Sequence, residues 1–190
     1  MRVLLARHGQ TDWNAAGKIQ GASDIPLNDT GRGQARALAE KLRTGKYPVQ
    51  AIYTSPLLRA RETAELVGEA LGVTVECAPE LKELNFGDWE GCSWGEIGER
   101  WPEQFAAYSA DRRNYAPPGG ESYADMLSRA RPFLDSLRRK PGGTVLCVCH
   151  SAVMRGLLAD LQGMSVNESY KRLRLPNGIV VPVESLQTAD

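Results

Sequence analysis

Short apolar segments alternate along the chain with longer segments in which apolar residues recur every three or four positions. The short segments predict strands of a buried sheet, because they are apolar or alternating and end in polar residues or turns. They cover residues 2–7, 51–54, 73–77, 144–149 and 179–183. Pro182 has no N–H for a central strand, so we expect the last strand at an edge.

The longer segments predict amphipathic helices between the strands. One begins at Asp29 or Thr30, either of which can cap it, and continues to about Thr44. Another follows Ser55 and Pro56, which are typical of an N-cap and a first helical position, and ends before residue 72.

Two further helices are predicted in the second half of the chain. One is capped by Ser122 and contains Pro132, which should kink it or shift its start. The other follows Ser151 and reaches about Leu161. Strands that alternate with such helices predict a three-layer α/β/α sandwich with a mostly parallel sheet.

Two segments interrupt this alternation. Residues 9–29 show no clear periodicity but contain apolar side chains, so we expect a packed, functional loop. Residues 79–121 are rich in aromatic side chains and end in a Pro-Pro-Gly-Gly turn. We expect them to form a helical insertion on the substrate side, within one domain that spans residues 1–190.

Composition excludes several classes of partner. Lys plus Arg and Asp plus Glu both number 23, so the net charge is zero and gives no reason to expect nucleic acid or an anionic membrane as a partner. No apolar run approaches the roughly 20 residues of a membrane helix, and the first residues do not resemble a secretory signal. We therefore expect a cytoplasmic protein, and a homodimer remains possible.

Polar residues follow three of the predicted strands. Arg7 and His8 end the first strand, Arg59 lies in the first turn after the second, and His150 and Ser151 follow the fourth. Ligands of parallel sheets bind at these ends. Arginines and helix N-termini suit a phosphate group, whereas two histidines beside arginines make a poor metal site. We therefore predict a phosphate site without a metal or other cofactor.

A histidine beside a bound phosphate predicts nucleophilic attack on phosphorus, and such a step needs a general acid for the leaving oxygen. The candidates lie together after the third strand. Spacing alone does not distinguish them; they are Glu80, Glu83, Asp88 and Glu90.

An ordered set of motifs resembles the histidine phosphatase superfamily, also called phosphoglycerate mutase-like. The motifs lie at residues 6–14, 20–21, 26–28, 31, 55–64, 83–91, 118–122 and 150–151. The resemblance implies that His8 becomes phosphohistidine and that Glu83 is first the acid and then the base for water. Arg7, Arg59 and a cationic His150 would form the phosphate pocket. It also implies the substrate-binding residues, which are Asn14, Gln20, Gly21 and Ser151.

The resemblance allows two reactions on a small phosphorylated metabolite. A phosphatase lets water attack phosphohistidine, whereas a phosphoglycerate mutase returns the phosphoryl group to a hydroxyl. The residues after Glu83, Leu-Asn-Phe-Gly, resemble broad-specificity and α-ribazole phosphatases and favour hydrolysis. Arg112 and Arg113 resemble the mutase segment that binds an acidic substrate, although they could equally be an exposed basic pair. An inactive binding module is a third alternative, which the complete catalytic set disfavours.

Overall fold

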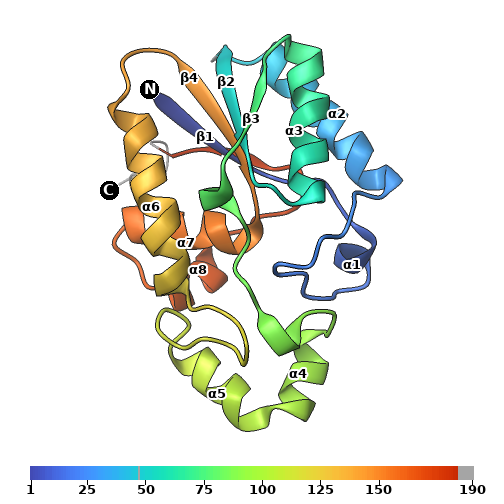
Figure 1. The fold of residues 1–190 in the computed structure, drawn as a ribbon, viewed down its shortest axis with the longest axis vertical. Coiled ribbons are helices and arrows are strands. Elements are labelled where there is room, and N and C mark those ends of the chain that lie inside the picture. Colours follow the sequence, from blue (N-terminus) through green and yellow to red (C-terminus); the bar gives the residue numbers. More distant parts are fainter. Residues whose placement is uncertain (47, 184–190) are drawn as a thin grey trace.

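The computed structural model describes residues 1–46 and 48–183, which form a five-stranded sheet between two layers of helices (Figure 1). The last residues of the predicted domain, 184–190, lie outside the described residues. The predicted three-layer α/β architecture is confirmed. Within the described part of the chain, no helix combines the length and apolarity needed to cross a bilayer.

The sheet has the strand order β3-β2-β4-β1-β5. Its strands are β1 (Arg2–Arg7), β2 (Val49–Thr54), β3 (Val75–Cys77), β4 (Thr144–Cys149) and β5 (Val180–Pro182). All neighbours pair in parallel except β5, which runs antiparallel to β1 at an edge, as Pro182 predicts. The predicted strand at residues 73–77 is two residues too long, since β3 begins at Val75. Val73 is held at the end of the preceding helix instead, because its N–H donates to Gly68 O.

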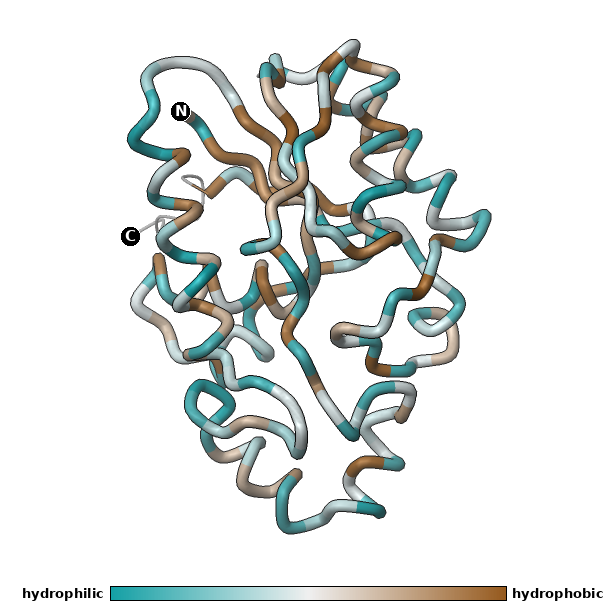
Figure 2. The backbone as a smooth tube through the Cα atoms, viewed as in Figure 1, coloured by the Kyte–Doolittle hydropathy of each residue, from teal (hydrophilic) through white to brown (hydrophobic). Residues whose placement is uncertain are grey.

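The core lies on both faces of the sheet. Every residue of β4 is buried, which explains its unbroken apolar run, since a central parallel strand is covered by helices on both sides. Helices α2 (Asp29–Arg43) and α3 (Leu58–Leu71) cover one face, and α6 (Tyr123–Arg139) and α7 (Ser151–Leu161) cover the other (Figure 1). Figure 2 shows the most hydrophobic segments gathered in the strands between these layers.

Two predicted helix starts are wrong in detail. Asn28, rather than Asp29 or Thr30, caps α2 through a hydrogen bond from Gly31 N–H to its side-chain oxygen. Ser55 does not cap α3: its hydroxyl accepts from Leu57 N–H, before the helix begins, and is hydrogen-bonded to the ring of His150, which follows the neighbouring strand β4. Helix α3 begins two residues after Pro56, where Asp24 accepts from Leu58 N–H at 2.6 Å.

The second half of the chain follows the prediction more closely. Ser122 caps α6 in a capping box with Asp125. Helix α6 starts where expected and continues through Pro132. Helix α8 (Val166–Arg172) was not predicted; it too begins with a capping box, which Ser165 and Glu168 form.

The insertion is helical, as predicted. It contains two 3-10 turns, η1 (Pro79–Leu81) and η2 (Gly87–Trp89), and the helices α4 (Trp94–Arg100) and α5 (Pro102–Ala110). Buried Trp89 packs edge-on against Tyr108 of α5 at 5.2 Å between ring centroids. Such aromatic pairs join η2, α4 and α5 into one body, which lies beyond the carboxyl ends of β1 and β4 (Figure 1). A short helix, α1 (Asp12–Ala15), lies in the predicted functional loop.

Candidate active site

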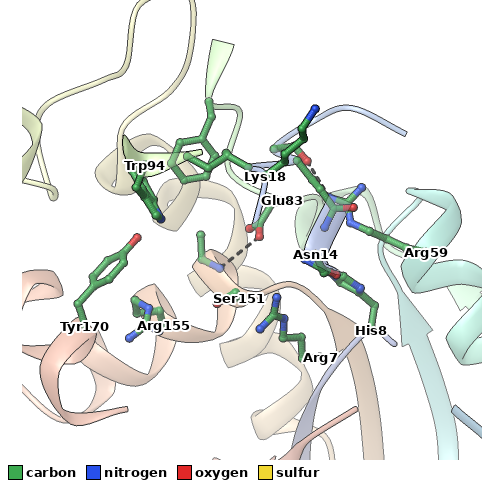
Figure 3. A pocket seen from close by; sticks show the side chains of 15 residues that line it. Arg7, His8, Asn14, Lys18, Arg59, Glu83, Trp94, Ser151, Arg155 and Tyr170 are labelled. Carbon is green, nitrogen blue, oxygen red and sulfur yellow. Dashed lines mark hydrogen bonds between the residues drawn. The ribbon is translucent and has the colours of Figure 1, made fainter. Parts of the chain in front are cut away.

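A cavity of about 260 Å³ opens between the carboxyl ends of the strands and the insertion (Figure 3). Its volume lies just below the roughly 300–1,000 Å³ of pockets for drug-sized ligands, so it suits a small metabolite. The end of β1, the functional loop, α3, the insertion and α7 all contribute to its lining. Among the lining residues expected from the sequence are Arg7, His8, Asn14, Gln20, Gly21, Arg59, Glu83 and Ser151.

His8 follows β1 and carries one free ring nitrogen. Its Nδ1 lies 2.6 Å from the carbonyl oxygen of Gly9. Because a carbonyl only accepts, Nδ1 must carry the proton and Nε2 the lone pair. Among the described residues Nε2 has no hydrogen-bond partner. Burial, with Arg59 and Arg7 nearby, holds the pKa of His8 well below its ordinary value, so the ring is neutral and nucleophilic.

Gly9 lets the end of β1 approach the first turn of α2. A Cβ at Gly9 would lie 2.3 Å from the carbonyl oxygen of Gly31, a distance that no side chain tolerates. The Gly9 N–H donates to the hydroxyl of Thr63 in α3. The backbone beside His8 is therefore fixed by two helices.

Arg7, which is half-buried, and Arg59, which is buried, bring two positive charges to the cavity. Arg7 Nη1 donates to Leu175 O, and the two Nη atoms of Arg59 donate to Ser23 O and Gly21 O, both at 2.7 Å. Carbonyls orient these guanidinium groups without neutralising them. Burial lowers the pKa of Arg59 to about 10, which still leaves it cationic at neutral pH.

Glu83 is the one of the four candidate acids that lines the cavity. Its carboxylate accepts from Leu84 N–H at 3.0 Å and from Ala152 and Val153 N–H, in the first turn of α7, at 3.3 Å. Burial raises the pKa of Glu83, although Arg59 opposes this shift. A carboxyl whose pKa is raised is suited to general acid catalysis near neutral pH.

The other three carboxylates have different surroundings. Asp88 is exposed and Glu80 lies outside the cavity. Glu90 accepts hydrogen bonds from Ala22 N–H, from the N–H and hydroxyl of Ser23, and from Phe86 N–H, so it ties the functional loop to the insertion. Of the four candidates, Glu83 therefore has the position that suits the acid implied by the resemblance, and its role stays a prediction.

His150 lies beside His8 but does not line the cavity. The two ring centroids are 5.1 Å apart, and His150 Nε2 lies 2.7 Å from the hydroxyl of Ser55. Burial, with Arg59 and His8 nearby, holds the pKa of His150 well below its ordinary value. Without a bound anion, the protein's own groups therefore favour a neutral His150; a cationic His150 against a phosphoryl group stays a prediction.

Asn14 and Gln20 line the cavity with their amide oxygens already engaged. Thr11 N–H donates to Asn14 Oδ1, and the Thr11 hydroxyl donates to Gln20 Oε1. In the described part of the chain their amide nitrogens meet no protein acceptor, which leaves these donors for an anion in the cavity.

Comparison with known proteins identifies the family. The model of the histidine phosphatase superfamily (branch 1) matches residues 3–187. The chain belongs to this superfamily. Members of this superfamily act through phosphohistidine.

The relatives include several enzymes. The 6-phosphofructo-2-kinase/fructose-2,6-bisphosphatase of Gallus gallus is 40% identical over 92% of this chain, which spans only 35% of that protein. The glucosyl-3-phosphoglycerate phosphatase of Mycobacterium tuberculosis is 36% identical over 87% of this chain and 77% of its own length. A protein of Serratia proteamaculans named as a probable phosphoglycerate mutase is 36% identical over 99% of this chain and 86% of its own length.

Solved structures agree with the fold. A mycobacterial glucosyl-3-phosphoglycerate phosphatase in complex with VO3 has a TM-score of 0.83 and 33% identity, and the match covers 94% of this chain and 90% of that one. The α-ribazole phosphatase of Shigella flexneri has a TM-score of 0.79 and 30% identity, and the match covers 95% of this chain and 88% of that one.

Two residues expected at the substrate lie elsewhere in this histidine phosphatase. Arg112 stacks on Tyr108 and Tyr170, with its guanidinium carbon 4.6 Å from the Tyr170 ring centroid, and donates to Asn167. Arg113 is half exposed and pairs with Asp160 at 3.5 Å. Neither lines the cavity, because the segment after α5 turns back onto α7 and α8.

Several cavity residues were not predicted as site residues; those with polar or ring side chains that reach beyond the phosphate residues include Lys18, Trp94, Arg155 and Tyr170. In Figure 3 Trp94, Arg155 and Tyr170 lie on the side of the cavity away from Arg59. Arg155 could have been found, because it lies one turn after Ser151 and interrupts the apolar run of α7. Tyr170 could not, since α8 itself was not predicted.

Histidine, cysteine, aspartate and glutamate side chains are common protein ligands of metal ions. Among the described residues no group of three or more such side chains is placed to hold a metal ion. Cys147 and Cys149 are buried free thiols of β4, and burial raises the pKa of Cys147 to about 12. Buried thiols with a raised pKa behave as small apolar residues of the core.

Proposed function

We propose that this chain is a phosphomonoester hydrolase that acts through phosphohistidine on a small phosphorylated metabolite. One observation carries the proposal: the lone pair of His8 Nε2, the guanidinium groups of Arg7 and Arg59 and the carboxyl of Glu83 share one cavity. The arrangement combines a nucleophile, charge stabilisation and a proton donor, which are the parts that phosphoryl transfer requires.

In the first step His8 Nε2 attacks phosphorus and the bond to the substrate oxygen breaks. Arg7 and Arg59 stabilise the charge on the phosphoryl oxygens, with hydrogen bonds from the amides of Asn14 and Gln20 and from the N-terminus of α7 at Ser151. Glu83 gives its proton to the departing oxygen, so the product leaves as a neutral alcohol.

In the second step a water molecule attacks phosphohistidine. Glu83, now a carboxylate, takes a proton from this water, and the N–P bond breaks with its electron pair returning to Nε2. Phosphate leaves, and both His8 and Glu83 regain their initial states. The negative charge of a bound phosphate dianion offsets the positive charge of the two arginines and favours protonation of His150. We therefore assign the cationic form of His150 to the site with phosphate bound.

Phosphoglycerate mutase is the second candidate, favoured by the mutase relative. Stopped-flow assays with 3-phosphoglycerate and p-nitrophenyl phosphate separate the two. We expect steady release of inorganic phosphate from both without 2,3-bisphosphoglycerate, because the leaving alcohol need not stay to receive the phosphoryl group. Interconversion of phosphoglycerates without phosphate release would contradict hydrolysis. Absence of both reactions would favour the inactive module.

We propose that the substrate carries a second negative group. Arg155 and Lys18 line the cavity beyond the phosphate residues, and the Nε and Nη2 of Arg155 meet no protein acceptor in the described residues. Tyr170 lies under this guanidinium at 4.3 Å. A carboxylate or second phosphate on the leaving group would pair with it, and the relative that acts on glucosyl-3-phosphoglycerate is consistent with such a substrate.

Replacing Arg155 with glutamine should therefore change selectivity. We expect KM for O-phosphoserine to rise about tenfold, since a charge-assisted hydrogen bond is lost, while KM for O-phosphoethanolamine, which lacks the carboxylate, changes little. Steady-state kinetics with both substrates measures the ratio. Arg113→Gln is the matched control and should leave both values unchanged. An equal rise for both substrates, or a larger effect in the control, would contradict the role of Arg155.

We propose that the protein works in the cytoplasm on soluble metabolites, without nucleic acid or membrane partners. Its zero net charge supports this. A homodimer stays a prediction.

A further inference from the structure

The end of β1 is held by a turn from the last part of the chain. In this turn, at residues 176–179, Ile179 N–H donates to Pro176 O, and Gly178 has a φ of +73°, which glycine adopts without strain. Gly178 N–H donates to the carbonyls of Arg7 and His8, and Arg7 N–H donates to Ile179 O. Backbone hydrogen bonds donated in both directions therefore join this turn to Arg7 and His8.

Asn177 points its side-chain amide from this turn toward the active site. Its Nδ2 lies 3.1 Å from His8 O, 3.3 Å from Gly9 O and 3.1 Å from Asn14 Oδ1. Two of these three partners are carbonyls, which only accept, so the group that faces them must be the NH2. The amide orientation of Asn177 is thereby fixed.

The first consequence concerns His8. The carbonyl of Gly9 that accepts from Asn177 also accepts the proton of His8 Nδ1. This second bond holds the carbonyl that selects the His8 tautomer and leaves the lone pair on Nε2.

The second consequence concerns Asn14. Its Oδ1 accepts from Thr11 N–H at 3.2 Å and from Asn177 Nδ2. With its oxygen held from two directions, the Asn14 NH2 is turned toward the cavity, which Asn14 lines. A flip of this amide would present an oxygen to a phosphate and repel it.

We propose that Asn177 is a positioning residue for the phosphate site, which fixes the His8 tautomer through Gly9 O and the Asn14 amide through Oδ1. It does not line the cavity, so it acts through these two groups and not by contact with substrate. The proposal rests on the proposed function in one respect, namely that the cavity binds a phosphoryl group.

A double-mutant cycle tests the link to Asn14. Asn14→Ala, Asn177→Ala and the double variant are titrated with orthovanadate by calorimetry, which needs no turnover. We expect Asn177→Ala to raise the Kd for orthovanadate about tenfold, the size typical of losing a residue that orients a ligand-binding group without touching the ligand. In the Asn14→Ala background, Asn177→Ala should raise the Kd less than about threefold, because the Asn14 amide that Asn177 orients is then absent.

Asn167→Ala is the matched control. Asn167 also donates its side-chain N–H groups to two carbonyls, those of Ser109 and Ala110, at 3.0 Å, but it lies away from the phosphate residues. We expect a loss of thermal stability similar to that of Asn177→Ala and an unchanged Kd for orthovanadate. If Asn167→Ala weakened orthovanadate as much as Asn177→Ala, the effect would be structural and the proposal wrong.

The remaining outcomes are also decisive. Equal losses from Asn177→Ala in both backgrounds, no loss in either, or a wild-type protein that does not bind orthovanadate would each overturn the positioning role. Wild-type protein that binds orthovanadate with the expected cycle but hydrolyses no phosphomonoester would overturn the proposed function alone.

Discussion

Replacing His8 with alanine is expected to reduce phosphatase turnover by at least about 10⁴-fold, the scale seen when a covalent nucleophile is removed. Arg7, Arg59 and Glu83 can still bind the substrate, but in the part of the chain that the structure describes no second imidazole lines the cavity. Release of inorganic phosphate from p-nitrophenyl phosphate measures the loss. Rapid quenching with a radiolabelled substrate should give an acid-labile phosphoprotein in the wild type and none in the variant.

The control for this variant is its ability to fold and bind. His8 is 2% exposed, so truncation should cost about 0.5–3 kcal/mol, less than the total stability of an ordinary domain. Circular dichroism should show a folded protein, and inorganic phosphate should still bind. Turnover near the wild-type rate in folded His8→Ala protein would remove the phosphohistidine mechanism.

The fold was predictable because its strands and helices each carry a strong local signal. Buried β4 is apolar throughout, and α6 has both its cap at Ser122 and an apolar stripe. The errors lie where a distant group decides the local structure. Ser55 is a good cap by sequence, but its hydroxyl bonds Leu57 N–H and the ring of His150, and at the start of the helix Leu58 N–H donates to Asp24 instead.

Local sequence signals predicted only part of the site. Arg7, His8 and Arg59 follow predicted strands, so topology alone brings them together. Glu83 needed the family resemblance, since nothing local separates it from Glu90. The far side of the cavity was not predictable: Arg112 was expected at the substrate, but stacking on Tyr170 holds it away, and Arg155 lines the cavity in its stead.

Replacing Glu83 with glutamine should impair the two steps differently according to the leaving group. For an alkyl phosphate the departing alkoxide needs a proton, so kcat/KM should fall about 10²–10⁴-fold. For p-nitrophenyl phosphate the departing phenolate is stable, so His8 should still be phosphorylated while hydrolysis slows for want of a base. Stopped-flow absorbance should therefore show a burst of p-nitrophenolate equal to the enzyme concentration, followed by slow turnover.

The pH dependence supplies an independent check on Glu83. It must be protonated to assist the leaving group, and burial raises its pKa, so kcat/KM for an alkyl phosphate should stay high above the ordinary titration range of a carboxyl and fall as pH rises through the raised pKa. His8 adds no loss near pH 6.5, because its pKa is lowered. Glu83→Gln should abolish the alkaline decline, while Glu80→Gln should retain it, because Glu80 lies outside the cavity. An alkaline decline that persisted in Glu83→Gln, together with no burst, would assign the acid to another group.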